Sequence, residues 1–178
     1  MDLSNILGAL TGNDAIGAIS QNLKIDSNQV SSVISAALPS ILGAMQQNAS
    51  TEGGAASLAK ALGDHAASAG NIISNLKATD LTDGNKILSH IFGGNLGNVI
   101  GSISKKSGAS TGNVTNILAS IAPSILALLG KSQQSSGTNA AGLAGMLGMV
   151  LGGASGNTNS GGLGSILGGL GSLFGKKN

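Results

Sequence analysis

The amino-acid sequence predicts an all-α fold, an internally duplicated helical array of two similar helix-turn-kinked-helix units followed by a Gly-rich C-terminal helical tail. Apolar residues recur at helical spacing along the chain. Residues 16–45 and 100–129 align without a gap at an offset of 84 positions, and nine of the thirty aligned positions are identical. The chain's only two prolines, Pro39 and Pro123, occupy the same place in the two segments, and each opens the tetrapeptide PSIL. This coincidence indicates duplication.

Each repeat unit begins with a short helix that continues, after a tight turn, into a long helix. In the first unit, the short helix carries Ile16, Ile19 and Leu23. Asp26 followed by Gln29 is typical of a capping box at the start of the next helix. The second unit is expected to repeat this arrangement.

Both prolines lie inside the long helices. The apolar stripe of each long helix keeps its phase across its proline, which favours one kinked helix over two helices joined by a loop. We therefore predict a kink just before Pro39 and another just before Pro123. The stripes consist of Val30, Val33, Ile34, Leu38, Ile41, Leu42 and Met45 in the first unit and Val114, Ile117, Leu118, Ile121, Ile125, Leu126 and Leu129 in the second.

We predict a duplicated helical domain over residues 1–131 and a tail over residues 132–178. Between the repeats, TEGGAASLAKALGDHA and LTDGNKILSHIFGG add shorter helices. The tail contains two flexible linkers, SQQSSGTN and GASGNTNSGG, and no charged residue occurs from Ser132 to Gly175. Its two short apolar helices carry Leu143, Met146, Leu147, Val150 and Leu151, and then Leu163, Ile166, Leu167, Leu170, Leu173 and Phe174.

The composition limits the chemistry that the chain can perform. It has no Trp, Tyr, Cys or Arg, and Phe92 and Phe174 are its only aromatic residues. The absence of Cys excludes disulfides and thiolate chemistry. The formal net charge is +2, and the Lys residues are spread along the chain, which predicts no broad surface for a polyanion.

The start of the chain and its apolar windows bear on its location. The stretch MDLSNILGAL contains no Lys or Arg, so it lacks the positive segment of a secretory signal. The longest strongly apolar window, Ala140 to Ala154, is shorter than the roughly 20 residues that cross a bilayer as a helix. We therefore expect a cytoplasmic protein without a membrane-spanning helix.

Several segments together resemble a known bacterial family. GGAASLAKALGDH, LTDGNKILSHIFGG and the two proline-containing helices occur in an order similar to that of the family of uncharacterised domains that includes YidB. Ile87 to Gly94 and Ile121 to Leu126 match its two most recognisable segments, and the likeness covers roughly residues 6–130. The resemblance implies an all-helical, duplicated, cytoplasmic bacterial protein and brings no catalytic residues. The chain departs from many members in having fewer charges around Asp64 and His65.

Residues 19–34 and 103–118 match the spacing of a helix-turn-helix. A DNA-binding role would direct Asn28 and Gln29, or Asn113 and Asn116, toward base edges. The would-be recognition helices contain no Lys or Arg, although phosphate contacts from these residues supply most non-specific affinity. A structural corner is therefore the favoured interpretation, and nucleic acid is a disfavoured partner.

Candidate catalytic, metal and phosphate sites are weak. His65 follows Asp64 and His90 follows Ser89, but neither spacing supplies converging metal ligands or frames a nucleophile. The stretch GGNLGNVIG (93–101) lacks the Gly-Lys-Ser ending of a phosphate-binding loop. Its glycines, at four-residue spacing, instead predict a smooth face for a neighbouring helix. We expect no enzymatic activity, cofactor or metal.

The last apolar stripe, from Leu163 to Phe174, admits two roles. On a membrane surface, Lys176 and Lys177 would lie near lipid headgroups. Docked on a second copy, the small residues Gly164, Gly168 and Gly171 would let another helix approach closely. Docking is favoured because the polar face of the stripe consists of Gly and Ser rather than basic residues.

We therefore predict a non-enzymatic structural or scaffold protein whose partner is itself. It would form a homo-oligomer or larger assembly through Gly-smoothed apolar helices, with both tail stripes at the contact. The alternative is a peripheral membrane protein that uses the tail, and DNA binding through the duplicated corners is less favoured.

Overall fold

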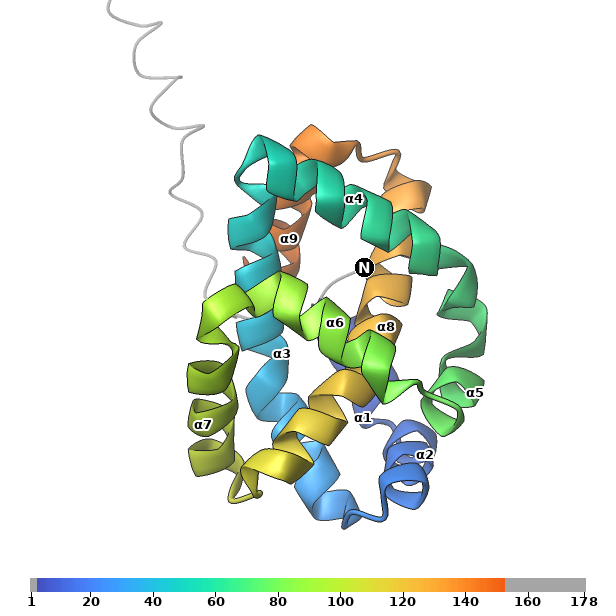
Figure 1. The fold of residues 1–178 in the computed structure, drawn as a ribbon. Coiled ribbons are helices and arrows are strands. Elements are labelled where there is room, and N and C mark those ends of the chain that lie inside the picture. Colours follow the sequence, from blue (N-terminus) through green and yellow to red (C-terminus); the bar gives the residue numbers. More distant parts are fainter. Residues whose placement is uncertain (1–2, 153–178) are drawn as a thin grey trace, which may run out of the picture.

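The computed structural model describes residues 3–152, and this range is all-α, with no strand (Figure 1). The predicted fold class is thus confirmed at the level of secondary structure, whereas the stripe from Leu163 to Phe174 lies outside the described residues. The elements are α1 Leu3–Thr11, α2 Asn13–Leu23, α3 Ser27–Ala49, α4 Glu52–Ala66, η1 Ala67–Asn71, α5 Ile72–Lys77, α6 Leu81–Phe92, η2 Gly93–Asn95, α7 Leu96–Ser107, α8 Thr111–Ser136, η3 Ala140–Gly142 and α9 Leu143–Gly152.

The turn between α2 and α3 and the turn between α7 and α8 have the same local geometry. Lys24 and Gly108, which are 84 positions apart, both adopt left-handed backbone conformations, with φ of 55° and 71°. Before each turn a serine hydroxyl, on Ser20 or Ser104, donates a 2.6 Å hydrogen bond to a backbone carbonyl five residues later. Gly108 adopts this conformation without strain from a Cβ atom, which Lys24 has.

Each long helix starts at a side-chain cap. The Asp26 carboxylate accepts hydrogen bonds from the backbone N–H groups of Asn28 and Gln29, and the Ser110 hydroxyl accepts one from Asn113. The predicted cap at Asp26 is therefore confirmed. The Gln29 side chain, which a capping box would direct back to Asp26, instead accepts a hydrogen bond from Asn113.

Both long helices run through their prolines without interruption. Pro39 lies inside α3 and Pro123 lies inside α8, which confirms one helix rather than two at each position. The bend just before each proline remains a prediction. Pro39 is exposed, whereas Pro123 is half-buried.

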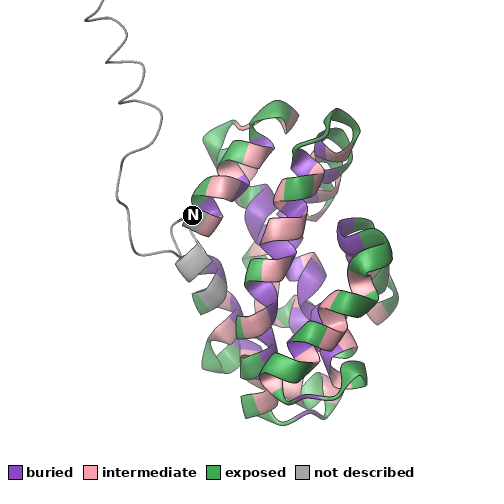
Figure 2. Ribbon diagram, turned by 90° about the vertical axis from the view of Figure 1, so that its left-hand side faces the viewer, coloured by how far each residue is buried: buried purple, intermediate pink, exposed green. Residues whose placement is uncertain are grey.

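Helix α8 forms the centre of the core. From Ile117 to Gly130 every residue except Pro123 is buried, whereas the buried residues of α3 form a stripe along one face. Buried positions lie on the inward faces of the helices and exposed positions on the outer faces (Figure 2). Helices α4 and α6 pack across α8.

Two glycines permit this close packing on α8. A Cβ atom at Gly84 of α6 would overlap the carbonyl of Ala119, and one at Gly130 of α8 would overlap the carbonyl of Leu62. The sequence predicted that the glycines of α7 would contact a neighbouring helix. No helix lies that close in the described structure, because a Cβ atom at Gly97 or Gly101 would meet no atom within 4 Å. Within residues 3–152 the predicted smooth face on α7 is therefore wrong.

Helix α8 is also long and apolar enough to cross a membrane, with a mean hydropathy of 1.5 over its most apolar 18 residues. The sequence-based choice of residues 140–154 as the longest apolar window was therefore wrong. Most of this α8 window, 72%, is buried inside the protein. Such burial is typical of the central helix of a globular core, so the hydropathy alone is weak evidence for a membrane span.

Candidate functional site

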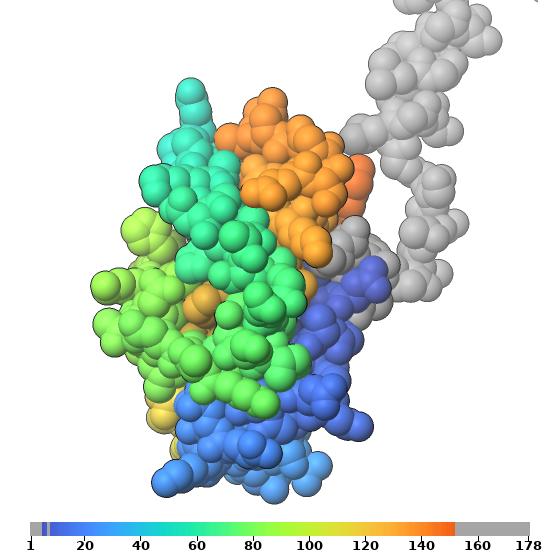
Figure 3. All heavy atoms as spheres, turned by 90° about the vertical axis from the view of Figure 1, so that its right-hand side faces the viewer, coloured from blue at the N-terminus to red at the C-terminus, as the bar shows by residue number. Residues whose placement is uncertain are grey.

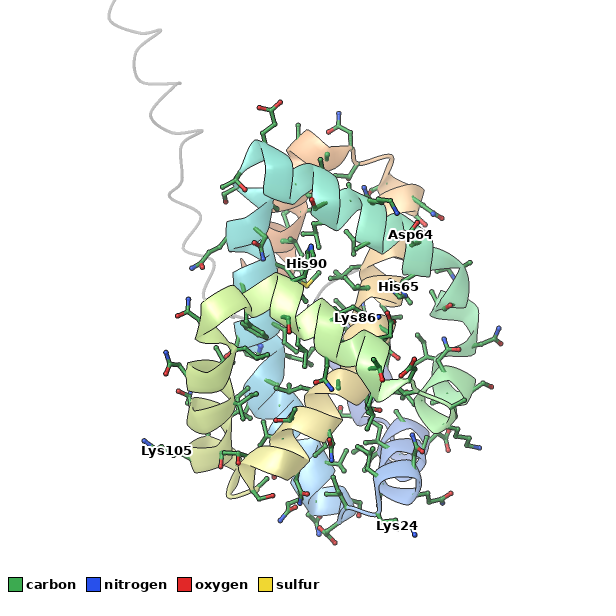
Figure 4. The ribbon with its side chains drawn as sticks, in the orientation of Figure 1. Lys24, Asp64, His65, Lys86, His90 and Lys105 are labelled. Atoms are coloured by element: carbon green, nitrogen blue, oxygen red, sulfur yellow. The ribbon has the colours of Figure 1, made fainter. Side chains whose placement is uncertain are left out.

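A cleft of about 520 Å³ lies between α4 and α6. Its apolar lining includes Leu58, Ile87 and Leu126. Its polar lining includes Lys60 and Asp64 from α4 and Lys86 and His90 from α6, and the side chains of Asp64, Lys86 and His90 are marked in Figure 4.

The Lys60 ammonium and the Asp64 carboxylate form an exposed ion pair one helical turn apart on α4. Lys60 Nζ lies 2.8 Å from Asp64 Oδ2. The side-chain hydrogen bond and the attraction between the charges lower the pKa of Asp64 and raise the pKa of Lys60. The two side chains are 78% and 61% exposed, so solvent screens the pair and it contributes little to stability.

The structure does not assemble the histidines into a metal site. Within residues 3–152 no group of three or more His, Asp or Glu side chains is arranged to hold a metal ion. His90 lines the α4/α6 cleft, whereas His65 is not among the cleft's lining residues.

A second hollow, of about 490 Å³, lies between α3 and α7, and we call it the α3/α7 groove. No charged residue lines it. Its α3 wall includes Gly43, which has no side chain, and Ala44, whose side chain is one methyl group. The surface of α3 therefore projects little into the groove at these two positions. The full lining is Pro39, Ser40, Gly43, Ala44 and Gln47 from α3, Ile91, Phe92 and Asn95 from the end of α6 and η2, and Asn98, Val99 and Ser102 from α7.

In the alignment of the two segments, α2 matches α7 and α8 matches α3. The pair formed by α2 and α8 is covered by another segment. Helix α5 packs against both α2 and α8, and green atoms of the α5 region lie next to the blue atoms of the α2 region on the face drawn in Figure 3. The Leu76 side chain is fully buried, and its carbonyl accepts a 3.1 Å hydrogen bond from Asn22 Nδ2. The α2/α8 pair is thus covered by α5, whereas the α3/α7 pair has an open groove.

Burial at matched positions supports this comparison. Ser40, Gly43 and Ala44 of α3 are half-buried, whereas the residues 84 positions later, Ser124, Ala127 and Leu128, are buried. On the shorter helices, Val99 and Ser102 of α7 are half-buried and exposed, whereas the residues 84 positions earlier, Ala15 and Ala18, are buried.

The two helix-turn-helix corners meet each other. Asn113 Nδ2 donates a 3.0 Å hydrogen bond to Gln29 Oε1, so these side chains are bonded within the protein. Asn28 and Asn116 remain exposed. Two of the four side chains nominated for base contacts are therefore engaged in a contact between the corners.

The first tail stripe lies largely in the core of its own chain. Helix α9 packs on α3, and Leu143, Leu147 and Val150 are buried while Met146 and Leu151 are half-buried. In the described chain these three buried residues are therefore not free to bind another copy. Met149, which the sequence interpretation did not select, is 80% exposed.

A sequence signal for this packing was present but missed. AASLAKALG (55–63) in α4 and AAGLAGMLG (140–148), which leads into α9, have six of nine positions identical at an offset of 85. In α4, which packs on α8, Leu58 and Leu62 are buried. The matching residues of α9, Leu143 and Leu147, are also buried, and α9 packs on α3. The gap-free alignment at an offset of 84 could not include this pair, because the offset changes by one residue.

The fold and its surfaces define a helical domain with one long central helix and grooves between neighbouring helices. The chain belongs to the family described as "Bacterial protein of unknown function (DUF937)", whose model matches residues 5–132. This family includes YidB, which confirms the resemblance inferred from the sequence. No curated protein and no solved structure matches the chain.

Proposed function

We propose that this chain is a non-enzymatic scaffold protein that self-associates through its C-terminal apolar region. The exposure of Met149 carries the proposal, because it leaves a large apolar side chain in water within a stretch, Ser132 to Gly175, that contains no charge. The apolar stripe from Leu163 to Phe174 follows Met149 in the same uncharged stretch, and apolar positions that gather in this way favour a contact with a partner. Because Leu143, Leu147 and Val150 serve the core, we assign the contact to Met149 and the stripe from Leu163 to Phe174.

We also propose that the chain arose by duplication of a four-helix unit, with α1 to α4 matching α6 to α9. Three observations support this proposal. The two turns have the same geometry, and Gln29 and Asn113, at matching positions, are hydrogen bonded to each other. Each of the matching helices α4 and α9 packs on the long helix of the other unit, α4 on α8 and α9 on α3. A further match joins LSNILGALTGN (3–13) to LSHIFGGNLGN (88–98), which have six of eleven positions identical. Duplication gives one subunit two similar faces, which favours repeated contacts between copies.

Size-exclusion chromatography with light scattering tests the self-association. We expect the full chain to form oligomers at micromolar concentration and a chain ending at Gly152 to be monomeric under the same conditions. A monodisperse full-length monomer would contradict the proposal. Met149→Gln in the full chain separates the contribution of the α9 surface from that of the last stripe.

A membrane surface is the second candidate partner, because the exposed Met149 and the Lys176 and Lys177 that end the uncharged stretch suit a lipid interface as well. Flotation with anionic vesicles distinguishes the two functions. Flotation of the full chain but not of the chain ending at Gly152 supports lipid binding, and equal flotation removes the tail from consideration.

A further inference from the structure

The open α3/α7 groove and the covered α2/α8 pair raise the question of what would cover the groove. In the α2/α8 pair, the covering segment follows α4 directly in the chain. The matching sequences of α4 and α9 make the segment after α9, residues 153–178, the counterpart of η1 and α5 in chain order.

The residues of α5 that face inward have a pattern that recurs in this later segment. Ile72 and Ile73 are half-buried and Leu76 is buried, so the apolar positions of IISNL are the first, second and fifth. ILGGL, from Ile166 to Leu170, has the same apolar positions. Its two glycines stand where α5 has Ser74 and Asn75, and small residues let a helix lie close to a low surface such as that at Gly43 and Ala44.

We infer that the α3/α7 groove binds Ile166 to Leu170 of the same chain, as the α2/α8 pair binds Ile72 to Leu76. Leu170 takes the position that Leu76 has beside α2. The groove suits this occupant because both the groove lining and the segment lack charged side chains. Burying them together leaves no unpaired charge, which would be costly.

The connection is long enough for docking within one chain. Thirteen residues lie between Gly152 and Ile166, and the fourteen Cα-to-Cα steps that join these two residues span up to about 46 Å when extended. A folded domain of this size has a diameter on the order of 40 Å. Short tethers give effective concentrations in the millimolar range, so at micromolar protein the groove binds its own chain before a second copy.

Docking within one chain has a consequence for assembly, and this consequence rests on the proposed function. A docked segment hides Ile166, Leu167 and Leu170 from other copies. Self-association then requires the segment to leave its own groove or to exchange with that of a neighbour, as in domain swapping. The groove would therefore set the concentration at which the protein assembles.

A cysteine pair tests the docking in the full chain, which contains no natural Cys. Ser102→Cys with Gly169→Cys should form a disulfide within one chain, detected as loss of free thiols without a dimer band on a non-reducing gel. The matched control is Ser57→Cys with Gly169→Cys, since Ser57 lines the α4/α6 cleft instead. Equal yields from the two pairs, or dimers as the main product of the first pair, would overturn the inference.

A groove-blocking variant makes the test independent of cysteine geometry. Gly43→Lys places a charged side chain in the groove without a clash, because a Cβ there meets no atom within 4 Å. It should lower the yield of the Ser102/Gly169 disulfide by at least about fivefold, since an unpaired charge opposes apolar docking. Gly17→Lys, also in open space but on α2, should leave the yield unchanged. An unchanged yield in Gly43→Lys would refute docking in this groove.

Light scattering on the unsubstituted chain, in which no disulfide holds the segment in the groove, separates this inference from the proposed function. Oligomers of that chain, with no groove disulfide in the cysteine pair, would refute the docking and leave self-association standing. The groove disulfide in the cysteine pair, with an unsubstituted chain that stays monomeric at all concentrations, would support the docking and refute self-association.

Discussion

The side chains of Gln29 and Asn113, which occupy equivalent positions in the two repeat segments, are hydrogen bonded to each other at 3.0 Å. The bond places the start of α3 beside the start of α8, so the two aligned segments contact each other directly at this point.

A double-mutant cycle measures this contact. Gln29→Ala and Asn113→Ala should each lower the free energy of unfolding by about 0.5–1.5 kcal/mol, as expected for a neutral, partly buried hydrogen bond. The double variant should lose less than the sum, because the second change removes an already broken bond. Urea titration provides the values, and Asn116→Ala, an exposed position on the same helix, should change stability by less than about 0.5 kcal/mol. Strictly additive effects would mean that the bond contributes nothing.

The glycines of the chain should divide into two classes. Gly84→Ala and Gly130→Ala should each destabilise the protein by about 1–3 kcal/mol or more, because the new methyl group overlaps a backbone carbonyl. Gly97→Ala and Gly101→Ala on α7 should stabilise it by up to about 1 kcal/mol, since Ala is the better helix former and space is open. Thermal unfolding of the four variants checks the opposite signs.

The two apolar residues Leu147 and Met149 of α9 should differ in the property that each controls. Leu147→Ala should cost about 2–5 kcal/mol of folding stability, because it empties a fully buried position. Met149→Ala should leave stability almost unchanged, because its side chain is exposed, and should weaken self-association. Denaturation and light scattering on both variants separate the two effects, and a stable Leu147→Ala protein that fails to associate would return Leu147 to the contact surface.

The Asp80 carboxylate should make the protein sensitive to acid. It caps α6 by accepting a hydrogen bond from the Thr82 backbone N–H, and this bond is the main cause of the lowered pKa of Asp80. A carboxyl group with a lowered folded-state pKa stabilises the fold above its unfolded pKa, near 3.9, and that stabilisation is lost as the pH falls through the folded-state value. Asp80→Asn should retain the cap and reduce the fall in stability between pH 5 and pH 2 (about the range over which an Asp titrates). NMR titration of Asp80 measures the shift directly.

The sequence was most informative where the physics is local. Asp26 as a cap and helices that continue through Pro39 and Pro123 follow from neighbouring residues, and all three are present. The roles of Leu143 and Leu147 could not be predicted in the same way, because helical spacing identifies an apolar face without saying whether α3 or a second copy covers it. The same limit explains the glycines, since close approach at Gly84 depends on where α6 crosses α8.

The candidate surfaces were harder to predict than the helices. In the described residues the groove between α3 and α7 is open, whereas α5 packs on α2 and α8. The aligned sequences of these helices do not show which of the two pairs is covered. The exposure of Met149 likewise depends on how α9 is rotated against α3. Both features follow from tertiary packing and not from periodicity.

The near-complete enclosure of α8 also bears on how the chain is made. An apolar helix of 26 residues would be a hazard if it emerged from the ribosome into water before its partners existed. Helices α4 and α6, which pack across α8, precede it in the chain and are therefore synthesised first. Both helices have therefore left the ribosome when α8 emerges, and they are available to cover its apolar surface.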